Sequence, residues 1–337
     1  MLGRLYPWSF SILLAFILLP LSVSVAESGI GQPVSRQGDE IMVCGQLFHT
    51  TAPVVLWLDP GGYDAYRVER RFSPMEKASW EDSVKEGAYL DTPNRYGMRK
   101  AGLNAKQLEK IRGGGWDLPM LQQVVDQFVM HYDVCGISKK CFQILHDSRG
   151  LSVHFMLDID GTIYQTLDLK ERAWHATRSN TRSVGIEIAG IGAYPKNKKS
   201  VLDQWYPVDS DGTIRLQPPR RIGHLGLRTV RFEGQPARQE QIVGTIQGVE
   251  LYQYDFTPQQ YDSLIKLTAT LCRIFPLIQC AYPSNDKGQL IPHQLADTQW
   301  RNYQGLLGHY HVQKNKTDPG PAFNWKQVVD GASRLLQ

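Results

Sequence analysis

The most regular pattern along the chain is an alternation of apolar with small or polar residues over Ser183–Ala189. Val184, Ile186 and Ile188 occupy every second position, which predicts a strand that buries one face. Other strands are predicted where short apolar runs end in turn signals: Val54–Leu58, Phe128–Met130, Val153–Asp158, Thr162–Leu167 and Gly305–Val312. Asp160-Gly161 joins two of these runs and predicts a hairpin.

Helical periodicity is strongest after Thr257, a residue suited to cap a helix. Tyr261, Leu264 and Leu271 then fall on one face at helical spacing, and the pattern stops near Pro276. Shorter helices are predicted at 104–111, 138–147 and 324–336. Strands that alternate with helices predict an α/β domain, with a single mixed central β-sheet flanked by helices.

The N-terminus differs from the rest of the chain. Arg4 is the only charged residue before Glu27. An apolar run follows it over Phe10–Val25, and the small residues Ser24-Val25-Ala26 stand at its end. This pattern is typical of a secretory signal peptide, here residues 1–26. The alternative is an uncleaved membrane anchor, but the run is shorter than the ~20 residues of a span and contains Pro20. We therefore expect a secreted or periplasmic protein without a stable membrane span.

The remaining chain divides into two parts. Residues 27–118 are predicted to form an N-terminal extension of unknown role. Residues 119–337 carry the clear strand and helix signals and are predicted to form the main domain. A stretch at about 191–250 is rich in glycine, proline and charge, which indicates a large insertion in that domain.

Composition changes this picture in two respects. A net charge of +4 in 337 residues is too weak and too evenly spread to indicate nucleic-acid binding, although it would favour an anionic polymer. The five cysteines include two pairs that are close in sequence, Cys135 with Cys141 and Cys272 with Cys280. In an oxidising compartment each pair is expected to form a disulfide, which leaves Cys44 over; the alternative is five unpaired thiols.

Three residues suggest a zinc site. His131 follows a predicted strand, His309 lies in the last predicted strand, and Asp318 precedes a proline that restricts its backbone. Two imidazoles, one carboxylate and an open fourth position are typical of zinc hydrolases. His311 would share the strand face of His309 and is a rival ligand. The alternative is that all these residues are solvated or packed in the core, since nine histidines make chance pairs easy to find.

Two further residues would complete a hydrolase. Glu187 is the one acidic residue in its apolar strand and is suited to take a proton from water and pass it to a leaving nitrogen. Lys316, two residues before Asp318, is suited to stabilise an oxyanion. Zinc would lower the pKa of water toward ~7.

Between residues 126 and 326 the chain resembles the zinc N-acetylmuramoyl-L-alanine amidase family, which includes the peptidoglycan recognition proteins and phage lysozyme-amidases. The resemblance rests on five motifs in the family's order: Phe128–Tyr132, Ser152–Gln165, Ala173–Ala176, Ser183–Ile188, and Gly308-His309 with Lys316–Phe323. Leu47–Ala52 superficially mimics the first motif. We interpret it as a decoy, because the later motifs follow His131, not His49, at suitable distance.

The resemblance implies zinc on His131, His309 and Asp318, and thus His309 rather than His311. It implies Glu187 as general base and Lys316 as oxyanion partner. Residues expected to line the cleft or to contact the carboxylates and sugars of a muropeptide are Trp174, His175, Arg178 and Asn180. The pair Cys135 and Cys141 is similar in place and spacing to a disulfide of the recognition-protein branch.

The implied function is hydrolysis of the amide between N-acetylmuramic acid and L-alanine, with peptidoglycan or muropeptides as partners. Two alternatives remain at this point. One is a module that binds peptidoglycan without cutting it, and the other is a zinc hydrolase of another cell-wall amide.

Overall fold

The computed structural model describes residues 3, 29–86, 92–100, 102–112 and 114–337. Residues 37–337 form one compact unit, and the described residues 29–36 do not belong to it. The predicted signal peptide lies outside the described residues apart from Gly3. Among the described helices, none is both long and apolar enough to span a membrane.

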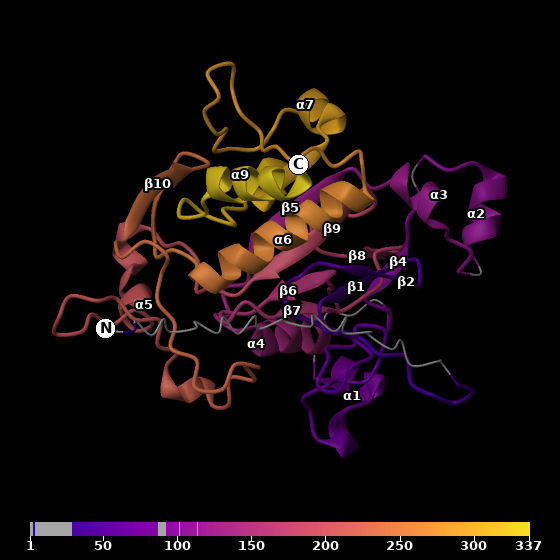
Figure 1. Ribbon diagram of the computed structural model, residues 1–337, viewed down its shortest axis with the longest axis horizontal. Coiled ribbons are helices and arrows are strands. Elements are labelled where there is room, and N and C mark those ends of the chain that lie inside the picture. Colours follow the sequence, from indigo (N-terminus) through magenta and orange to yellow (C-terminus); the bar gives the residue numbers. More distant parts are fainter. Residues whose placement is uncertain (1–2, 4–28, 87–91, 101, 113) are drawn as a thin grey trace. The chain divides into compact units, whose positions relative to one another are not determined.

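The centre of the larger unit is a mixed six-stranded sheet in the order β12-β5-β9-β6-β7-β3 (Figure 1). All neighbouring pairs are parallel except β6 with β7, which form the hairpin predicted at Asp160-Gly161. The strands are β3 (Val54–Leu56), β5 (Gln127–Tyr132), β6 (Phe155–Leu157), β7 (Ile163–Gln165), β9 (Ser183–Ile188) and β12 (Gly305–Gly308). The predicted α/β class with a mixed central sheet is confirmed.

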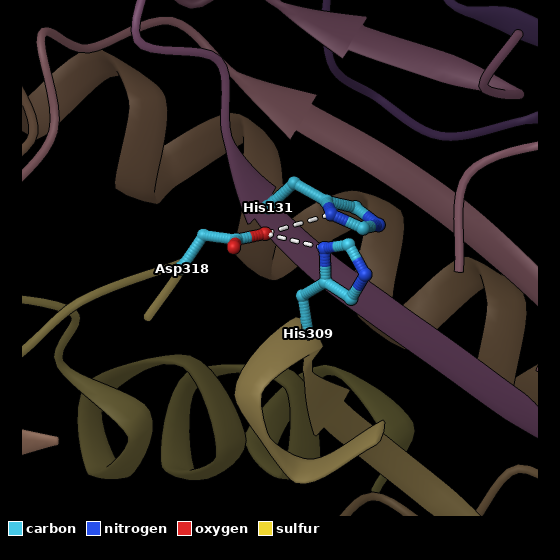
Figure 2. A group of neighbouring side chains, drawn as sticks. All are labelled: His131, His309 and Asp318. Atoms are coloured by element: carbon cyan, nitrogen blue, oxygen red, sulfur yellow. Dashed lines mark hydrogen bonds and ion pairs between the residues drawn. The ribbon is translucent and has the colours of Figure 1, made fainter. Parts of the chain in front are cut away.

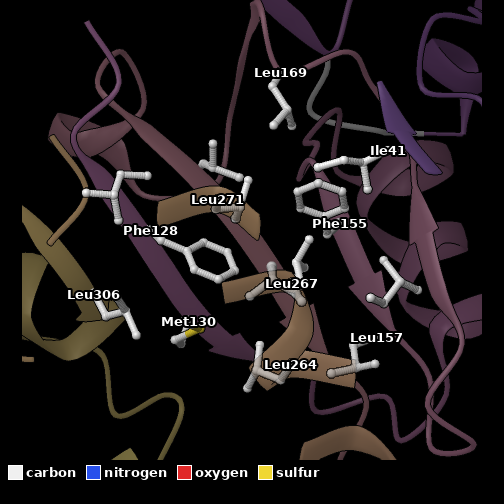
Figure 3. Close-up of a cluster of buried hydrophobic side chains, with 14 of the residues drawn as sticks. Ile41, Phe128, Met130, Phe155, Leu157, Leu169, Leu264, Leu267, Leu271 and Leu306 are labelled. Atoms are coloured by element: carbon white, nitrogen blue, oxygen red, sulfur yellow. The ribbon is translucent and has the colours of Figure 1, made fainter. Parts of the chain in front are cut away.

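Helices cover the sheet, and the longest ones lie over one face (Figure 1). The α-helices are α1 (Trp80–Lys85), α2 (Ala105–Arg112), α3 (Leu118–Gln122), α4 (Ser138–Phe142), α5 (Ser200–Asp203), α6 (Pro258–Ile274), α7 (Asp297–Asn302), α8 (His309–Val312) and α9 (Trp325–Leu336). Leu264, Leu267 and Leu271 of α6 meet Phe128 and Phe155 of the sheet in the main core (Figure 3). Met156, between Phe155 and Leu157, joins a second core on the other face, as alternation along a strand requires.

The start of α6 shows why local sequence predicted it well. The Thr257 hydroxyl accepts a hydrogen bond from the Gln260 amide at 3.1 Å, and the Gln260 side chain accepts one from the Thr257 amide at 2.9 Å. This capping box satisfies two amide groups that a helix start leaves without partners.

Several predicted elements have slightly different bounds in the structure, and two of them change type partway. The strand predicted over Gly305–Val312 ends at Gly308, and His309–Val312 form the short helix α8. The amide of Gly308 donates to His311 Nδ1 at 2.8 Å, a bond that joins the end of β12 to α8. The helix predicted over 138–147 is α4 followed by a π-helical segment, Gln143–Ser148.

From residue 37 on, the described part of the segment before residue 118 belongs to the same compact unit as the sheet. Its strand β3 forms the edge of the central sheet beside β7. It also supplies the hairpin β1 (Glu40–Val43) with β2 (Gln46–His49), and β4 (Tyr96–Met98), which pairs with β8 (Glu171–Ala173).

The stretch predicted as an insertion contains α5 and the first strand of the hairpin β10 (Ile242–Ile246) with β11 (Val249–Gln253). Its buried residues form a cluster around Trp205. The Trp205 ring lies so close to Gly136 that a Cβ there would be 2.2 Å from it. The insertion thus packs on the loop that follows β5.

Candidate active site

The candidate site lies at the carboxyl ends of three adjacent parallel strands. His131 of β5 and Glu187 of β9 are directly paired cross-strand neighbours, and His309 directly follows β12. In open α/β sheets this edge is the usual place of a functional site. The strand order β12-β5-β9 therefore gathers side chains that lie far apart in the sequence.

His131, His309 and Asp318 converge on one point (Figure 2). The Nδ1 atoms of the two histidines lie 2.8 Å and 3.0 Å from the same oxygen, Oδ2 of Asp318. All three side chains are buried. The sequence-predicted ligand set is thus brought together in space.

This donor set fits a zinc ion. Two imidazole nitrogens and one carboxylate oxygen, all within 4.8 Å of one another, are the ligands of many catalytic zinc sites. Another group of possible ligands among the described residues, Asp39, Glu40 and His49, lies at the β1–β2 hairpin, where His49 Nδ1 is 2.8 Å from Asp39. His49 does not line the cleft around His131.

The electrostatics of two of these residues, His131 and Asp318, favour metal binding. Burial, followed by the nearby His309, lowers the pKa of His131 to about 4. Burial would raise the pKa of Asp318, but His309 and His131 outweigh it and hold that pKa below its usual range. Near pH 7, His131 is therefore neutral and Asp318 ionised, which are the forms that bind a metal.

Glu187 and Lys316 line the same cleft as the three candidate ligands. Burial, followed by the charges of Asp318 and Asp133, raises the pKa of Glu187 well above its usual value. Lys316 lies in the loop before Asp318, and this loop is held to β5 by a hydrogen bond of 2.6 Å between the Tyr132 and Thr317 hydroxyl groups.

His311 is excluded as the rival ligand. Its Nδ1 accepts the Gly308 amide at 2.8 Å, and its Nε2 lies 2.7 Å from the carbonyl of Ile291, to which it donates. The prediction that it shares a strand face with His309 was wrong, because the strand has ended and both residues lie in α8.

The predicted substrate-contacting residues divide into two groups. Trp174 and His175 line the cleft, and His175 Nδ1 lies 3.0 Å from His131 Nε2. Asn180 does not line the cleft: its buried carboxamide oxygen accepts the amides of His175 at 3.1 Å and Ala176 at 2.6 Å. It shapes the loop that carries His175.

Arg178 also lies outside this cleft. Its guanidinium is stacked over the Trp300 ring at 4.3 Å and donates to Asp297 at 2.5 Å. It borders a separate, open groove with Thr177, Gln313 and Lys314. Its predicted contact with substrate stays a prediction.

Three residues that support the site were missed from the sequence. Gln313 Oε1 lies 2.6 Å from His309 Nε2. The signal would have been a helix predicted to start at His309, since residues four apart lie on the same side of a helix. Ser183 and Gly185 share the face of Glu187 on β9, and both contact His175. The alternation along this strand had already placed Ser183 and Gly185 on the same face as Glu187, and this could have indicated their role.

The cysteines are all present as thiols. The Sγ atoms of Cys135 and Cys141 lie within 4.8 Å of each other and of the Asp133 carboxylate, and both residues line the cleft. The thiols of Cys272 and Cys280 are also in contact. Both predicted disulfides stay predictions. Burial raises the pKa of Cys44 to about 12, so its thiol is unreactive at neutral pH.

Several solved structures resemble this chain at low identity. A selenomethionine AmpD derivative is 17% identical over 70% of this chain and 89% of its own, with a TM-score of 0.33. The amidase AmiD from E. coli, in complex with anhydro-N-acetylmuramic acid-L-Ala-D-gamma-Glu-L-Lys, is 18% identical over 61% and 57%, with a TM-score of 0.35. The endolysin amidase LysCS from Clostridium intestinale URNW is 18% identical over 64% and 88%, with a TM-score of 0.33.

Sequence comparison gives the assignment. No curated protein matches the chain significantly. The family model for N-acetylmuramoyl-L-alanine amidase, type 2, matches residues 121–321, which is more than half of the chain and includes both histidines, Asp318, Glu187 and Lys316. The chain therefore belongs to the type 2 family of N-acetylmuramoyl-L-alanine amidases.

Proposed function

We propose that this amidase depends on zinc and hydrolyses the amide between N-acetylmuramic acid and L-alanine in the stem peptides of peptidoglycan. The observation that carries the proposal is the convergence of His131, His309 and Asp318 in a cleft that Glu187 and Lys316 also line. Zinc bound by these three residues would supply a Lewis acid that polarises the amide carbonyl and makes water nucleophilic near pH 7.

Glu187 is the residue that moves protons. It is the cross-strand neighbour of His131, and burial raises its pKa, so its carboxylate accepts a proton from water more readily than an exposed one would. It then delivers this proton to the amide nitrogen as the carbon–nitrogen bond breaks. Both transfers occur within the same cleft.

Lys316 is the residue that stabilises negative charge. Its ammonium group is a fixed positive charge on the cleft wall, and it would offset the charge that develops on the carbonyl oxygen during attack. The hydrogen bond between Tyr132 and Thr317 limits how far the loop of Lys316 can move.

Substrate contact is proposed for Trp174 and His175. Both line the cleft, and the Trp174 ring offers an apolar surface against which a sugar ring or the lactyl group can pack. Arg178 borders a neighbouring groove, where its charge would favour a carboxylate of the stem peptide.

We also propose that the protein is exported, with residues 1–26 removed. This rests on the apolar run and the small residues that end at Ala26. N-terminal sequencing of the protein from its producing cells should begin at Glu27. A protein that begins at Met1 and sediments with membranes would instead indicate an uncleaved anchor.

The proposal is tested by digestion of peptidoglycan. The purified protein is incubated with intact sacculi and, separately, with a soluble anhydro-muropeptide of the kind present in the AmiD complex, and the products are identified by mass spectrometry. Matched samples contain a chelator or the Glu187→Ala variant. Free peptides that begin with L-alanine, absent from both matched samples, are the expected result.

Other products would select an alternative. Intact muropeptides in every sample, with the protein retained on the sacculi, would indicate a binding module. Chelator-sensitive cleavage at another amide would indicate a different cell-wall hydrolase.

A further inference from the structure

A chain of hydrogen bonds runs from a backbone carbonyl to His131. The Ser183 hydroxyl lies 2.7 Å from the carbonyl oxygen of Ser179 and 3.2 Å from His175 Nε2. His175 Nδ1 lies 3.0 Å from His131 Nε2, and His131 Nδ1 faces Asp318 at 2.8 Å.

The direction of this chain follows from its first member. A carbonyl only accepts, so the single hydroxyl proton of Ser183 goes to Ser179, and toward His175 the Ser183 oxygen can only accept. Nε2 of His175 must then carry a hydrogen. In a neutral imidazole this leaves Nδ1 as an acceptor.

The same reasoning extends to His131. Because His175 Nδ1 accepts, His131 Nε2 carries the hydrogen and donates it. A lone pair therefore remains on His131 Nδ1, and it points at a carboxylate oxygen 2.8 Å away. Two acceptors at this distance repel each other unless a cation lies between them.

We propose that His175 and Ser183 are positioning residues that hold His131 as the Nε2–H tautomer, with its Nδ1 lone pair presented to a metal ion beside Asp318. The inference rests on the metal dependence proposed above and deepens it. Histidine ligands of metals usually donate their other ring N–H to a fixed acceptor. Here that acceptor is a second histidine, whose own tautomer is set by Ser183 and the backbone.

Packing gives independent support for the place of His175. A Cβ on Gly185 would lie 2.4 Å from both Cε1 and Nδ1 of His175, which is closer than nonbonded atoms can approach. Only glycine at this position of β9 lets the ring lie between the strand and His131. Ser183 and Gly185, on the same face of β9, thus both position the His175 ring, the first by a hydrogen bond and the second by leaving room for it.

The second histidine ligand has a simpler arrangement. His309 Nε2 lies 2.6 Å from the side-chain oxygen of Gln313, so a neutral His309 also presents the lone pair of Nδ1 to Asp318. Both imidazoles then use the same ring atom toward the metal. The two supports differ, because Gln313 is half-exposed whereas Ser183 is fully buried.

The test measures zinc affinity of the full chain by competition with a chromophoric chelator. His175→Leu removes the acceptor and should weaken zinc binding about 10- to 100-fold. His175→Asn places an oxygen near the position of Nδ1 and should recover most of the loss. Gly185→Ala should weaken binding as well, because it displaces the ring.

Ser183→Ala tests the distal link, and Ser263→Ala is its matched control. The Ser263 hydroxyl is also buried and donates to a backbone carbonyl, that of Gly161 at 2.6 Å, but it lies on α6. Ser183→Ala should weaken zinc binding several-fold, and Ser263→Ala should leave it unchanged. Thermal unfolding with chelator present checks that each variant is folded.

A second readout separates this inference from the proposed function. Nitrogen-15 NMR of the histidines in zinc-loaded protein should show His131 with its hydrogen on Nε2 and with Nδ1 bound to the metal. A hydrogen on Nδ1 overturns the inference, whether or not the protein proves to be a zinc amidase. Zinc affinity in His175→Leu within twofold of wild type also overturns it and leaves the amidase proposal intact. If wild type binds no zinc, this inference and the metal dependence proposed above fail together, whereas a zinc-bound protein without amidase activity contradicts only the amidase proposal.

Discussion

Replacement of Glu187 by glutamine separates proton transfer from metal binding and from folding. The substitution keeps the size of the side chain and leaves His131, His309 and Asp318 in place. It removes the only group in the cleft that we assign to proton transfer. Zinc content should therefore stay at the wild-type level while turnover falls.

The size of the loss follows from the cleft. General acid–base catalysis contributes about 10²- to 10⁴-fold, which corresponds to about 2.7–5.4 kcal/mol in the barrier at 1.36 kcal/mol per tenfold.

The stability of the metal-free Glu187→Gln variant should rise although its activity falls. Burial raises the pKa of Glu187 above that of the unfolded chain, so the folded protein binds more protons than the unfolded one between the two values. Stability without metal then falls as pH rises above about 4.3. Glutamine does not titrate, so at pH 7 the metal-free variant should be at least as stable as wild type, with the difference vanishing below about pH 4.

The assay combines muropeptide turnover followed by mass spectrometry, zinc content, and thermal unfolding with chelator at pH 4 and pH 7. Glu187→Ala serves as a comparison that also loses volume. A variant Glu187→Gln that keeps more than a tenth of wild-type activity would refute the role of Glu187 as the base. Loss of zinc in parallel with activity would show that Glu187 supports the metal site instead.

Three further predictions concern the rest of the chain. Leu267→Ala, at a fully buried position of the main core, should lower the free energy of unfolding in urea by about 2–5 kcal/mol. Leu335→Ala, at a side chain that is 50% exposed, should lower it much less. Similar losses in the two variants would contradict the core assignment. Thr257→Ala removes the cap of α6 and should cost about 1 kcal/mol, and an unchanged urea midpoint would show that the capping box adds no net stability. Thiol titration of the denatured, unreduced protein should find one thiol per chain, that of Cys44, if both predicted disulfides form in the exported protein, and five thiols would refute the pairing.

Local sequence patterns determined most elements of the sheet and the longest helices. Alternation predicted β9, and in the structure Val184, Ile186 and Ile188 enter the main core. Helical spacing and a cap predicted α6, which begins after Thr257. These predictions succeed because alternation and capping depend on a few neighbouring residues, and the printed sequence contains all of them.

Sequence motifs identified the residues of the site, but they did not predict its geometry. His311 is two residues from His309, and only the turn into α8 at Gly308 separates their roles. Asn180 lies close in sequence to His175, yet its side chain accepts backbone hydrogen bonds within that loop instead of facing the cleft. A single sequence does not show which hydrogen bonds a polar side chain makes, because its partners depend on the path of the backbone.

The sequence by itself thus determined the kind of fold, the elements that build it and the residue types that suit zinc chemistry. Only the tertiary structure decided that β12, β5 and β9 lie side by side, so that His309, His131 and Glu187 meet at one edge of the sheet. It also decided that β3, from the segment before residue 118, completes that sheet. The physical reason is that strand pairing and ring packing join residues more than a hundred positions apart, as in the contact of His131 with Asp318, and local pattern carries no information about such partners.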